Sequence, residues 1–385
     1  MFLVVRAPGV EIALCLATCS SNSADMRRWL NACALVLAAC GAPKPADAPP
    51  PVAPPPAVAD NEPWLTTLDR DHPLVGDIWD AEQGAVIDAS ALARRLATAK
   101  FVLLGEQHDN PDHHRLQARL ITELVKAGRR PAVVLEMLEI EQQPEIDRYV
   151  AQSDASAAGF GAALGWEKTS WPPFSEYQPI FEAAFATKLS IVAGNIAQEQ
   201  ARALVKQGLG ALPAERAHQL RLDQPFPPAL EAALIDELRA SHCGQLPESL
   251  LGPMALAQHA RDAQMAQALR SAGGVDGAVL IAGAGHARLD RGAAYYLKLE
   301  EPDAQVVSVL FHEVHREDKD ASGTFTQQGP FDYVWFTPRA SDDDPCAGFH
   351  ERQSREGPCR VRNQTYARNQ ISPMISRPAA RRFAF

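Results

Sequence analysis

The sequence lacks several patterns by which the chemistry of a protein is usually recognised. It holds no CxxC pair for a structural metal, no HExxH spacing for a zinc protease and no GxSxG elbow for a serine nucleophile. Basic residues are the minority, 37 against 47 acidic ones, and the formal net charge of -10 argues against a nucleic-acid backbone as partner. Beyond residue 40, no apolar run is long enough to cross a membrane.

What the sequence does have is a secretory signal near its start. Arg27 and Arg28 precede an apolar run, residues 29–37, and two alanines stand directly before Cys40. This is the form of a lipobox, and it predicts a mature chain that begins at Cys40 and carries acyl groups there. We therefore expect a lipid-anchored protein of the bacterial cell envelope, and Gly41 agrees with placement at the outer membrane. The alternative is an ordinary secretory signal with a chance cysteine.

The residues ahead of this signal fit the interpretation poorly. Glu11 interrupts the apolar stretch near the N-terminus, and no basic cluster precedes that stretch. We infer that Met26 is the true start of the protein. On this hypothesis residues 1–39 contain the signal peptide, which is removed from the mature chain.

Composition divides the rest of the chain into three parts. Residues 40–63 are rich in Pro and Ala, so they cannot build a core and are expected to form an extended spacer. Residues 64–338 are long enough for one large domain, and the overall 46% hydrophobic and 22% charged residues suit a soluble globular protein. Residues 339–385 combine three aspartates with an Arg-rich stretch and few apolar residues, which predicts a disordered tail.

Three cysteines remain besides Cys40 once the signal is removed. In an oxidising compartment Cys346 and Cys359 are close enough in sequence to form a disulfide, which would leave Cys243 unpaired. The sequence leaves the pairing open.

Short apolar runs alternate with helical patterns through the domain. Such runs suit strands buried on both faces of a sheet, so we expect an α/β fold with a mainly parallel sheet flanked by helices. The stretch from about residue 197 to 265 lacks such runs and predicts a smaller, all-helical sub-domain, while residues 76–88 suit a small hairpin. The five predicted strands are residues 101–104, 132–135, 189–193, 278–282 and 306–310.

Polar side chains follow four of these runs at the point where each run ends. In a parallel sheet these carboxyl ends lie along one edge, where open α/β proteins place their ligand sites. A plainer reading is that Glu136 and His286 only satisfy neighbouring turns. We favour one shared crevice, and its predicted members are Glu106, His108, Glu136, Asn195 and His286.

Two adjacent histidines open the helix that follows the first predicted strand. Asn110 suits the N-cap, so His113 and His114 fall in the first helical turn, where the helix dipole disfavours the imidazolium form. Neutral imidazoles there suit a metal or a carboxylate such as a haem propionate. Since the two are adjacent, at most one is expected to face the crevice. Asp262 is a further candidate, because it would fix the tautomer of a site histidine; an ordinary surface aspartate is the alternative.

A second cluster is aromatic and is interrupted by prolines. Trp166, Trp171 and Tyr177 are either part of the core or the lining of a flat hydrophobic ligand site. A tyrosine phenolate can hold ferric haem iron as a single axial ligand, and Tyr177 is the tyrosine that we predict in that role. The stretch from His312 to His315 resembles a metal motif only superficially and is interpreted as a strand end.

With these residues assembled, the sequence resembles the ChaN-like haem-binding lipoproteins, in the superfamily that also contains Tiki, TraB and erythromycin-esterase-like proteins. The resemblance runs from about His72 to Leu310. It is carried by Leu103–His114, Leu135–Met137, Trp171, Tyr177–Pro179, Ala193–Asn195, Arg261–Asp262 and Gly283–His286.

The resemblance implies haem binding in iron acquisition, with dimers that hold haem between their subunits and an outer-membrane haem transporter as partner. It also implies tyrosine ligation of the iron and histidine contacts to the propionates. The Pro-rich spacer and the Arg-rich tail lie outside the family pattern.

Two other functions compete with haem binding. A hydrolase related to the same superfamily would use Glu106, His108 and His286 to hold a divalent metal that activates water, or would use His108 as a general base. A structural or partner-binding lipoprotein without any site is the third interpretation. The four polar strand ends argue against it.

Overall fold

The computed structural model describes residues 3–7, 10–14, 63–343 and 346. The expected lipobox at Cys40, the start at Met26, the spacer up to residue 62 and the tail from residue 347 lie outside the described residues. Residues 1–51 form a unit of their own, in which β1 (Leu3–Ala7) pairs with β2 (Val10–Leu14) as an antiparallel hairpin. Among the described helices, none is both long and apolar enough to span a membrane.

Eight strands of the larger unit form one sheet in the order β4-β3-β10-β9-β5-β8-β6-β7. The six strands from β10 to β7 run parallel, and the β3–β4 hairpin adds an antiparallel edge. The strands are β3 (Ile78–Asp80), β4 (Ala85–Ile87), β5 (Phe101–Glu106), β6 (Ala132–Glu139), β7 (Ile191–Asn195), β8 (Ala278–Gly283), β9 (Val306–Glu313) and β10 (Tyr333–Thr337).

The fold class predicted from the sequence is confirmed, and each of the five apolar runs forms a strand. The sequence pattern did not reveal β10, which lies between β9 and the hairpin. Its run, Tyr333–Thr337, is aromatic rather than aliphatic and follows a short helix, so it lacks the pattern that marked the others.

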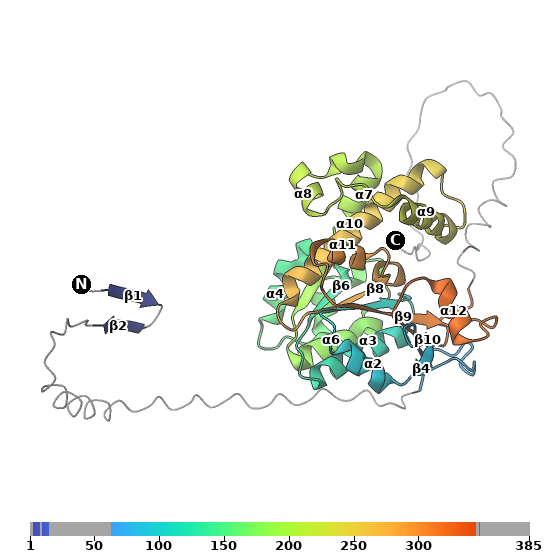
Figure 1. Cartoon of the computed structure of the whole chain (residues 1–385), viewed down its shortest axis with the longest axis horizontal. Helices are drawn as coiled ribbons and strands as arrows, with labels where there is room; N and C mark the ends of the chain where they lie inside the picture. The colour runs from blue at the N-terminus through green and yellow to red at the C-terminus, as the bar shows by residue number, and fades with distance from the viewer. Residues whose placement is uncertain (1–2, 8–9, 15–62, 344–345, 347–385) are drawn as a thin grey trace, which may run out of the picture. The chain divides into compact units, whose positions relative to one another are not determined.

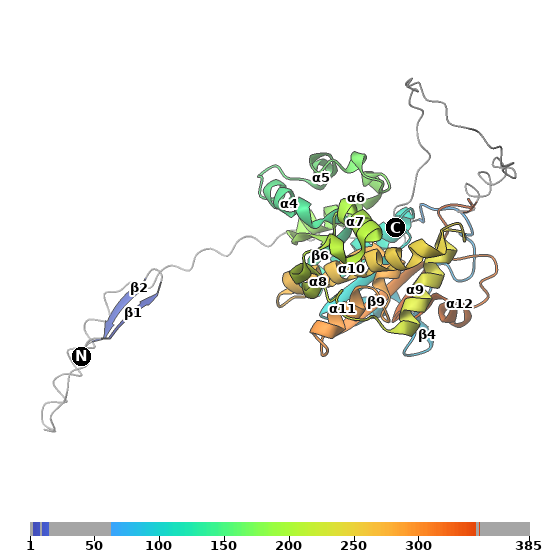
Figure 2. The same ribbon diagram turned by 90° about the horizontal axis from the view of Figure 1, so that it is seen from above.

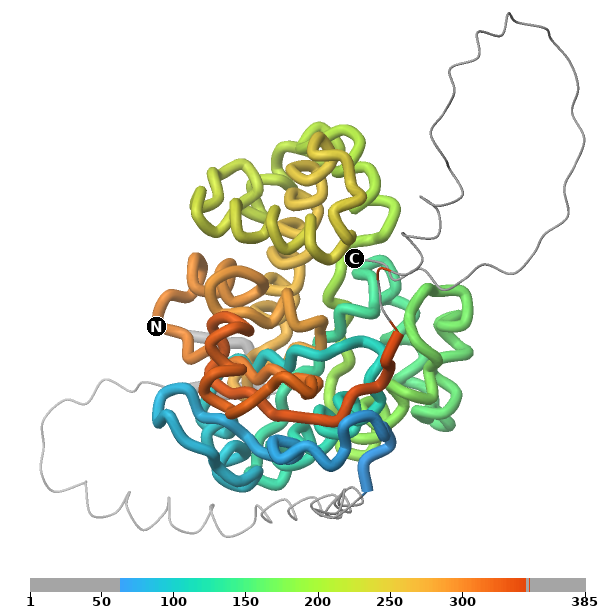
Figure 3. The backbone as a smooth tube through the Cα atoms, turned by 90° about the vertical axis from the view of Figure 1, so that its right-hand side faces the viewer, coloured from blue at the N-terminus to red at the C-terminus, as the bar shows by residue number. Residues whose placement is uncertain are grey.

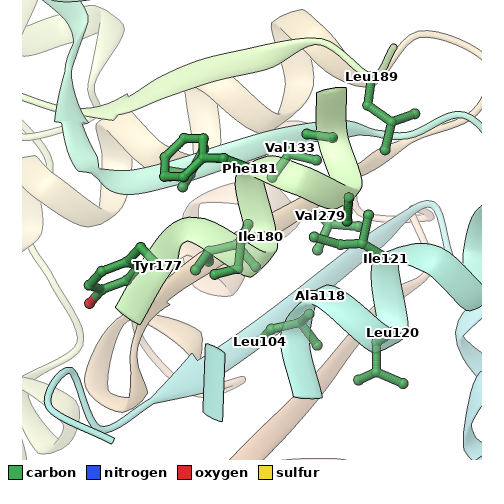
Figure 4. Packing of buried hydrophobic residues seen from close by; sticks show 14 of the residues in the cluster. Leu104, Ala118, Leu120, Ile121, Val133, Tyr177, Ile180, Phe181, Leu189 and Val279 are labelled. Carbon is green, nitrogen blue, oxygen red and sulfur yellow. The ribbon is translucent and has the colours of Figure 1, made fainter. Parts of the chain in front are cut away.

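Helices cover both faces of the sheet in a three-layer arrangement (Figure 1 and Figure 2). One core, shown in part in Figure 4, packs Leu104, Val133 and Val279 against the helices of one face. These helices are α2 (Ala89–Leu96), α3 (Pro111–Lys126), α4 (Gln143–Val150), α5 (Ala157–Ala163) and α6 (Phe174–Thr187). The second core packs the alternate strand positions against α7 (Gln198–Gln207), α8 (Ala214–Gln219), α10 (Glu248–Gly273), α11 (Ala293–Glu300) and α12 (Ala321–Gln328).

The chain between β7 and β8 is helical throughout, as the sequence predicts, and stands beside the sheet layers in Figure 3. Within it α9 (Pro228–Ser241) packs on the first half of α10 through a small separate core, made by Leu234, Leu238, Leu251 and Ala255. The second half of α10 belongs to the main core. The helical part therefore has only a modest core of its own.

The disulfide differs from the one considered from the sequence. Cys346 pairs with Cys243, which lies just after α9, across 103 residues. The expectation that Cys243 would be left odd is wrong, because folding brings the turn after α9 to the segment that follows β10; Cys359 lies outside the described residues. The bond ties the helical part to the C-terminal end of the sheet domain.

Candidate functional site

The carboxyl ends of β5, β6 and β8 bring their polar residues together. Glu106 is the last residue of β5 and pairs in register with Gly283, the last residue of β8. Glu136 lies in β6, and His286 lies in the short 3-10 turn, Ala284–Ala287, that follows β8. All three side chains are buried. The structure therefore brings these three polar residues from the strand ends together in one place.

Glu106 is the hub of the first half of this cluster. Its Oε1 accepts a hydrogen bond from the Tyr177 hydroxyl at 2.6 Å and lies 2.9 Å from Nδ1 of His108. Its Oε2 accepts from the Gln117 side chain at 2.8 Å, and His114 Nε2 lies 3.5 Å from Oε1. Helices α3 and α6 thus deliver three of the four partners. A buried carboxylate with this many donors is satisfied in its charged form.

The pKa of Glu106 reflects this surrounding. Burial alone would raise the pKa of the carboxyl group, but the charge of His114 and the hydrogen bond to His108 outweigh burial and hold the pKa well below its usual range. The group is therefore a fixed negative charge beneath His108 at any physiological pH.

Glu136 is the hub of the second half. Its Oε2 accepts a hydrogen bond from the backbone N–H of Gly283 at 2.8 Å, and its Oε1 lies 3.4 Å from Nε2 of His286. The other ring nitrogen of His286 lies 2.6 Å from Asp262 of α10. Asp262 therefore orients His286. Of the two interpretations that the sequence allowed, a partner of a site histidine and an ordinary surface aspartate, the structure agrees with the first.

Neighbouring charges also determine the pKa values in the half of the cluster around Glu136. Burial opposes the charged form of His286, but Glu136 and Asp262 on either side of the ring raise its pKa to about 10. Burial likewise opposes the charge on Glu136, and His286 overcomes it, so that the pKa of Glu136 falls to about 2. His286 is therefore an imidazolium at neutral pH and lies between Glu136 and Asp262, and burial raises the pKa of the Asp262 carboxyl group.

His108 lies between the two halves of the cluster and contacts both glutamates. Its Nδ1 faces Glu106, and its Nε2 lies 3.9 Å from Glu136. Burial would lower its pKa, but the hydrogen bond to Glu106 and the charge of Glu136 raise it above the usual value. Its side chain is 22% exposed, against 0% for Glu106. His108 is therefore the more exposed of the two site histidines, since the side chain of His286 is 11% exposed.

Two neighbours fix the ring of His108. Trp171 makes an edge contact with it, with ring centroids 5.0 Å apart. A Cβ on Gly283 would stand 2.9 Å from Nε2, so any other residue at Gly283 would push the ring aside. The space that the imidazole needs thus explains the glycine at the last position of β8.

The adjacent histidines of α3 point to different places. Asn110 caps the helix as the sequence predicts, with its side chain accepting from the backbone of Asp112 and His113. His114 stacks on Tyr177 at 3.8 Å inside the cluster. His113 points away from it, bonded to the Gln107 backbone and to Thr337 of β10, and burial lowers its pKa to about 3. His113 is therefore a neutral structural residue in this arrangement.

The placement of Tyr177 does not suit the role of iron ligand that we predicted. The side chain is fully buried and shares a core with Trp166. Burial and the neighbouring charge of Glu106 raise the pKa of its hydroxyl well above the usual value, which disfavours the phenolate that iron prefers. In this arrangement Tyr177 is a hydrogen-bond donor that supports Glu106.

The remaining predicted residue and one missed residue complete the cluster. Asn195 at the end of β7 donates to the Glu136 backbone carbonyl at 3.0 Å, and its Oδ1 is buried without a hydrogen-bond partner in the described part of the chain. Gln117 was not singled out as a site residue, although it follows His114 by three positions and so shares its face of α3. That spacing is the signal by which the sequence would have revealed it.

No group of three or more His, Cys, Asp or Glu side chains among the described residues is arranged to hold a metal ion. The divalent-metal alternative is therefore not supported. His312, near the end of β9, contacts Asp318 in the loop that follows, which agrees with its interpretation as a strand-end residue.

Fold and site together define an α/β protein with a buried carboxylate–imidazole network at the carboxyl edge of a mainly parallel sheet. The profile of the family described as haem-binding uptake, Tiki superfamily, ChaN matches residues 92–297, more than half of the chain. The chain therefore belongs to this family. The matched range contains the whole of the cluster described above.

One solved structure agrees with the fold. The structure titled cofacial heme binding to ChaN of Campylobacter jejuni shares 22% identity, covers 67% of this chain and 95% of its own, and superposes with a TM-score of 0.55. The type III effector HopBA1 and a mutant of erythromycin esterase EreC each share 14% identity, at a TM-score of 0.33. HopBA1 covers 64% of this chain and 91% of its own, and EreC covers 66% and 78%. No curated protein matched the chain.

Proposed function

We propose that this protein binds haem through the crevice at the carboxyl edge and acts in haem and iron acquisition. Membership of the haem-binding ChaN family supports the ligand. The observation that carries the proposal is the pairing of His108, a partly exposed imidazole with a raised pKa, with the aromatic edge of Trp171. Haem is a flat apolar ring with two propionates, so it needs an aromatic wall and a cation side by side.

The residues present fit the propionates better than they fit the iron. His108 would hold a propionate, because Glu106 fixes its ring and the carboxylates of Glu106 and Glu136 raise its pKa, which favours the charged form. Haem, when bound, supplies a ferric iron. Tyr177 can ligate that iron only if its hydroxyl leaves Glu106. An unchanged visible spectrum of the haemin complex in Tyr177→Phe would remove Tyr177 from that role.

The test is a titration of the whole mature chain with haemin, followed at the Soret band. We expect saturable binding and a shifted Soret maximum. His108→Ala should weaken haemin binding about ten-fold or more, the usual effect of losing one charge-assisted hydrogen bond. The matched control is His218→Ala, an exposed histidine of α8. Absence of saturable binding in the wild type overturns the function, while equal affinity of the wild type and His108→Ala overturns the assigned site.

The cellular setting belongs to the same proposal. An acyl group on Cys40 would hold the crevice in the envelope, at the outer membrane, where an outer-membrane haem transporter would be the partner. Haem held between two copies of the chain would make the protein dimeric. Radiolabelled palmitate should enter the wild type and not Cys40→Ser, and sedimentation with and without haemin should reveal the dimer. A labelled Cys40→Ser chain would exclude the anchor.

One observation favours a second candidate, a metal-independent hydrolase. Glu106 orients His108, and Asp262 orients His286, so each imidazole has the carboxylate partner that general bases have in known hydrolases. The raised pKa of each ring argues the other way, since a base must be neutral to accept a proton. Turnover of p-nitrophenyl esters that is lost in His108→Ala would favour this candidate, and no turnover would exclude it.

A further inference from the structure

The segment that carries His108 is a short turn between β5 and α3. It begins at Gln107, directly after the last residue of β5, and ends at Asn110, the N-cap of α3. The backbone N–H of Asn110 donates to the Gln107 carbonyl at 3.1 Å, which closes the turn. His108 is the second residue of this turn, so the position of its ring depends on how the backbone of the turn is held.

A buried histidine of α3 holds the first peptide group of the turn. The backbone N–H of Gln107 donates to Nδ1 of His113 at 2.9 Å. A backbone N–H can only donate, so Nδ1 must be unprotonated and the ring proton must lie on Nε2. Nε2 then donates to the hydroxyl oxygen of Thr337 at 2.8 Å. These two contacts assign a single neutral tautomer to His113.

The His113 ring is anchored to the sheet at its other end. The Thr337 hydroxyl accepts from the ring, and its own proton is left for the backbone carbonyl of His312, which lies 3.3 Å away. Thr337 ends β10 and His312 lies in β9, so the anchor consists of two paired parallel strands. The ring is fully buried and packs beside Phe311, with ring centroids 5.6 Å apart. His113 therefore links the sheet to the turn.

This link requires a neutral ring. An imidazolium has a hydrogen on each nitrogen, so Nδ1 of a charged His113 would have no lone pair with which to accept from Gln107. Burial lowers the pKa of His113 to about 3, and the ring is therefore neutral at physiological pH. The acceptor at Nδ1 is thus present under all conditions in which the protein would bind a ligand.

The turn sets the contacts that His108 makes with the two glutamates. Its Nδ1 lies 2.9 Å from Glu106, and its Nε2 lies 3.9 Å from Glu136. Hydrogen bonds weaken steeply when their distance or angle departs from the optimum. Because His108 directly follows Gln107, a displacement of the Gln107 peptide would move the imidazole and weaken its contact with Glu106. The pKa of His108, which this contact raises, would then fall.

We propose that His113 is a positioning residue, whose Nδ1 holds the Gln107 peptide so that His108 faces Glu106 and Glu136. The inference deepens the proposed function and rests on it for its consequence, because His108 is the histidine that would meet the propionate. The geometry itself does not depend on haem. What the turn needs from His113 is an acceptor at Nδ1, in addition to the packing of the ring.

Two variants of the whole chain separate positioning from packing. His113→Asn keeps an oxygen acceptor in the place of Nδ1, whereas His113→Leu has no acceptor. Both lose the bond to Thr337 and the ring that packs beside Phe311. NMR titration of the His108 ring without haemin should show its pKa falling toward the ordinary value of 6.5 in His113→Leu. In His113→Asn the pKa of His108 should stay near that of the wild type.

Haemin titration of the same variants extends the test to the ligand. Affinity should fall several-fold in His113→Leu and less in His113→Asn. If His113→Leu proves poorly folded by circular dichroism, His113→Gln replaces it, because its amide can reach Thr337 and leaves no acceptor in the place of Nδ1. An unchanged pKa of His108 without that acceptor, or an equal fall in His113→Asn, overturns the positioning role. Absence of haemin binding to the wild type overturns the proposed function, while the titration without haemin still decides the role of His113.

Discussion

The same strand contains two buried regions that are stabilised in opposite ways. Leu104 and Glu106 lie two residues apart in β5, and both are buried. Leu104 is stabilised by leaving water, which needs no particular partner. Glu106 is stabilised only while His108, Gln117 and Tyr177 donate to it. Substitutions in the strand interior should therefore cost stability in proportion to the apolar surface that they remove. The stability of the strand end depends instead on all of its hydrogen bonds being made, and on pH.

The largest loss of stability is expected when the hydrogen bonds to Glu106 are removed. Glu106→Ala removes the acceptor of three donors, two of them buried, and should lower the free energy of unfolding by about 3–5 kcal/mol, the usual cost of opening a buried charge pair. Leu104→Ala is the matched control at a cost of about 2–5 kcal/mol. Urea unfolding measures both. Glu106→Gln keeps a side-chain acceptor and should retain part of the stability that Glu106→Ala loses; an equal loss in both variants would contradict the comparison.

Opening the disulfide has the next largest expected effect. Cys243→Ser breaks a link across 103 residues and should cost about 2–4 kcal/mol. The helical part relies on this link because its own core contains only four buried residues among those described. Urea unfolding of Cys243→Ser against the oxidised wild type measures the cost, with Cys359→Ser as control. A larger effect of Cys359→Ser would contradict the pairing.

The dependence of stability on pH distinguishes the ionised strand ends from the apolar strand interior. The pKa of Glu136 is lowered to about 2, so its contribution is present above its unfolded value near 4.5 and is lost as pH falls toward 2. The pKa of His286 is raised to about 10, so its contribution is full below about 6.5 and is lost as pH rises through 10. Stability should therefore peak at mildly acidic pH. Glu136→Gln should flatten the acid limb, and an unchanged limb would refute this assignment.

The smallest effect on stability concerns the mouth of the crevice. Gly283→Ala should change the free energy of unfolding by only about 1 kcal/mol, because its backbone conformation suits any residue and only the His108 ring must move. Haemin affinity should fall several-fold, because the displaced ring no longer meets its propionate. Gly285→Ala, whose added Cβ would lie 3.4 Å from the nearest side-chain atom, is the control. Unchanged haemin affinity in Gly283→Ala would separate His108 from haem.

The sequence predicts those features of the fold that are determined by local residue patterns. The five apolar runs formed strands, Asn110 capped α3, and the polar residues after the strands met, because parallel topology alone brings such ends together. The sequence did not predict the orientations of single side chains. His113 turns away from the crevice because it meets Thr337 of β10, the strand that the sequence pattern did not reveal.

The other differences between prediction and structure come from contacts between residues that lie far apart in the sequence. Tyr177 follows an aromatic, Pro-broken segment that suits a surface site equally well, and only the packing of α6 against α3 buries its hydroxyl on Glu106. Cys243 and Cys346 meet because the turn after α9 reaches the end of the sheet domain, which no spacing in the sequence encodes.

The most direct test is to locate the iron in crystals of the haemin complex by its anomalous scattering. We predict haem at the mouth of the crevice, against Trp171, with a propionate on His108. Haem on a surface that leaves His108 in contact with solvent would contradict the account.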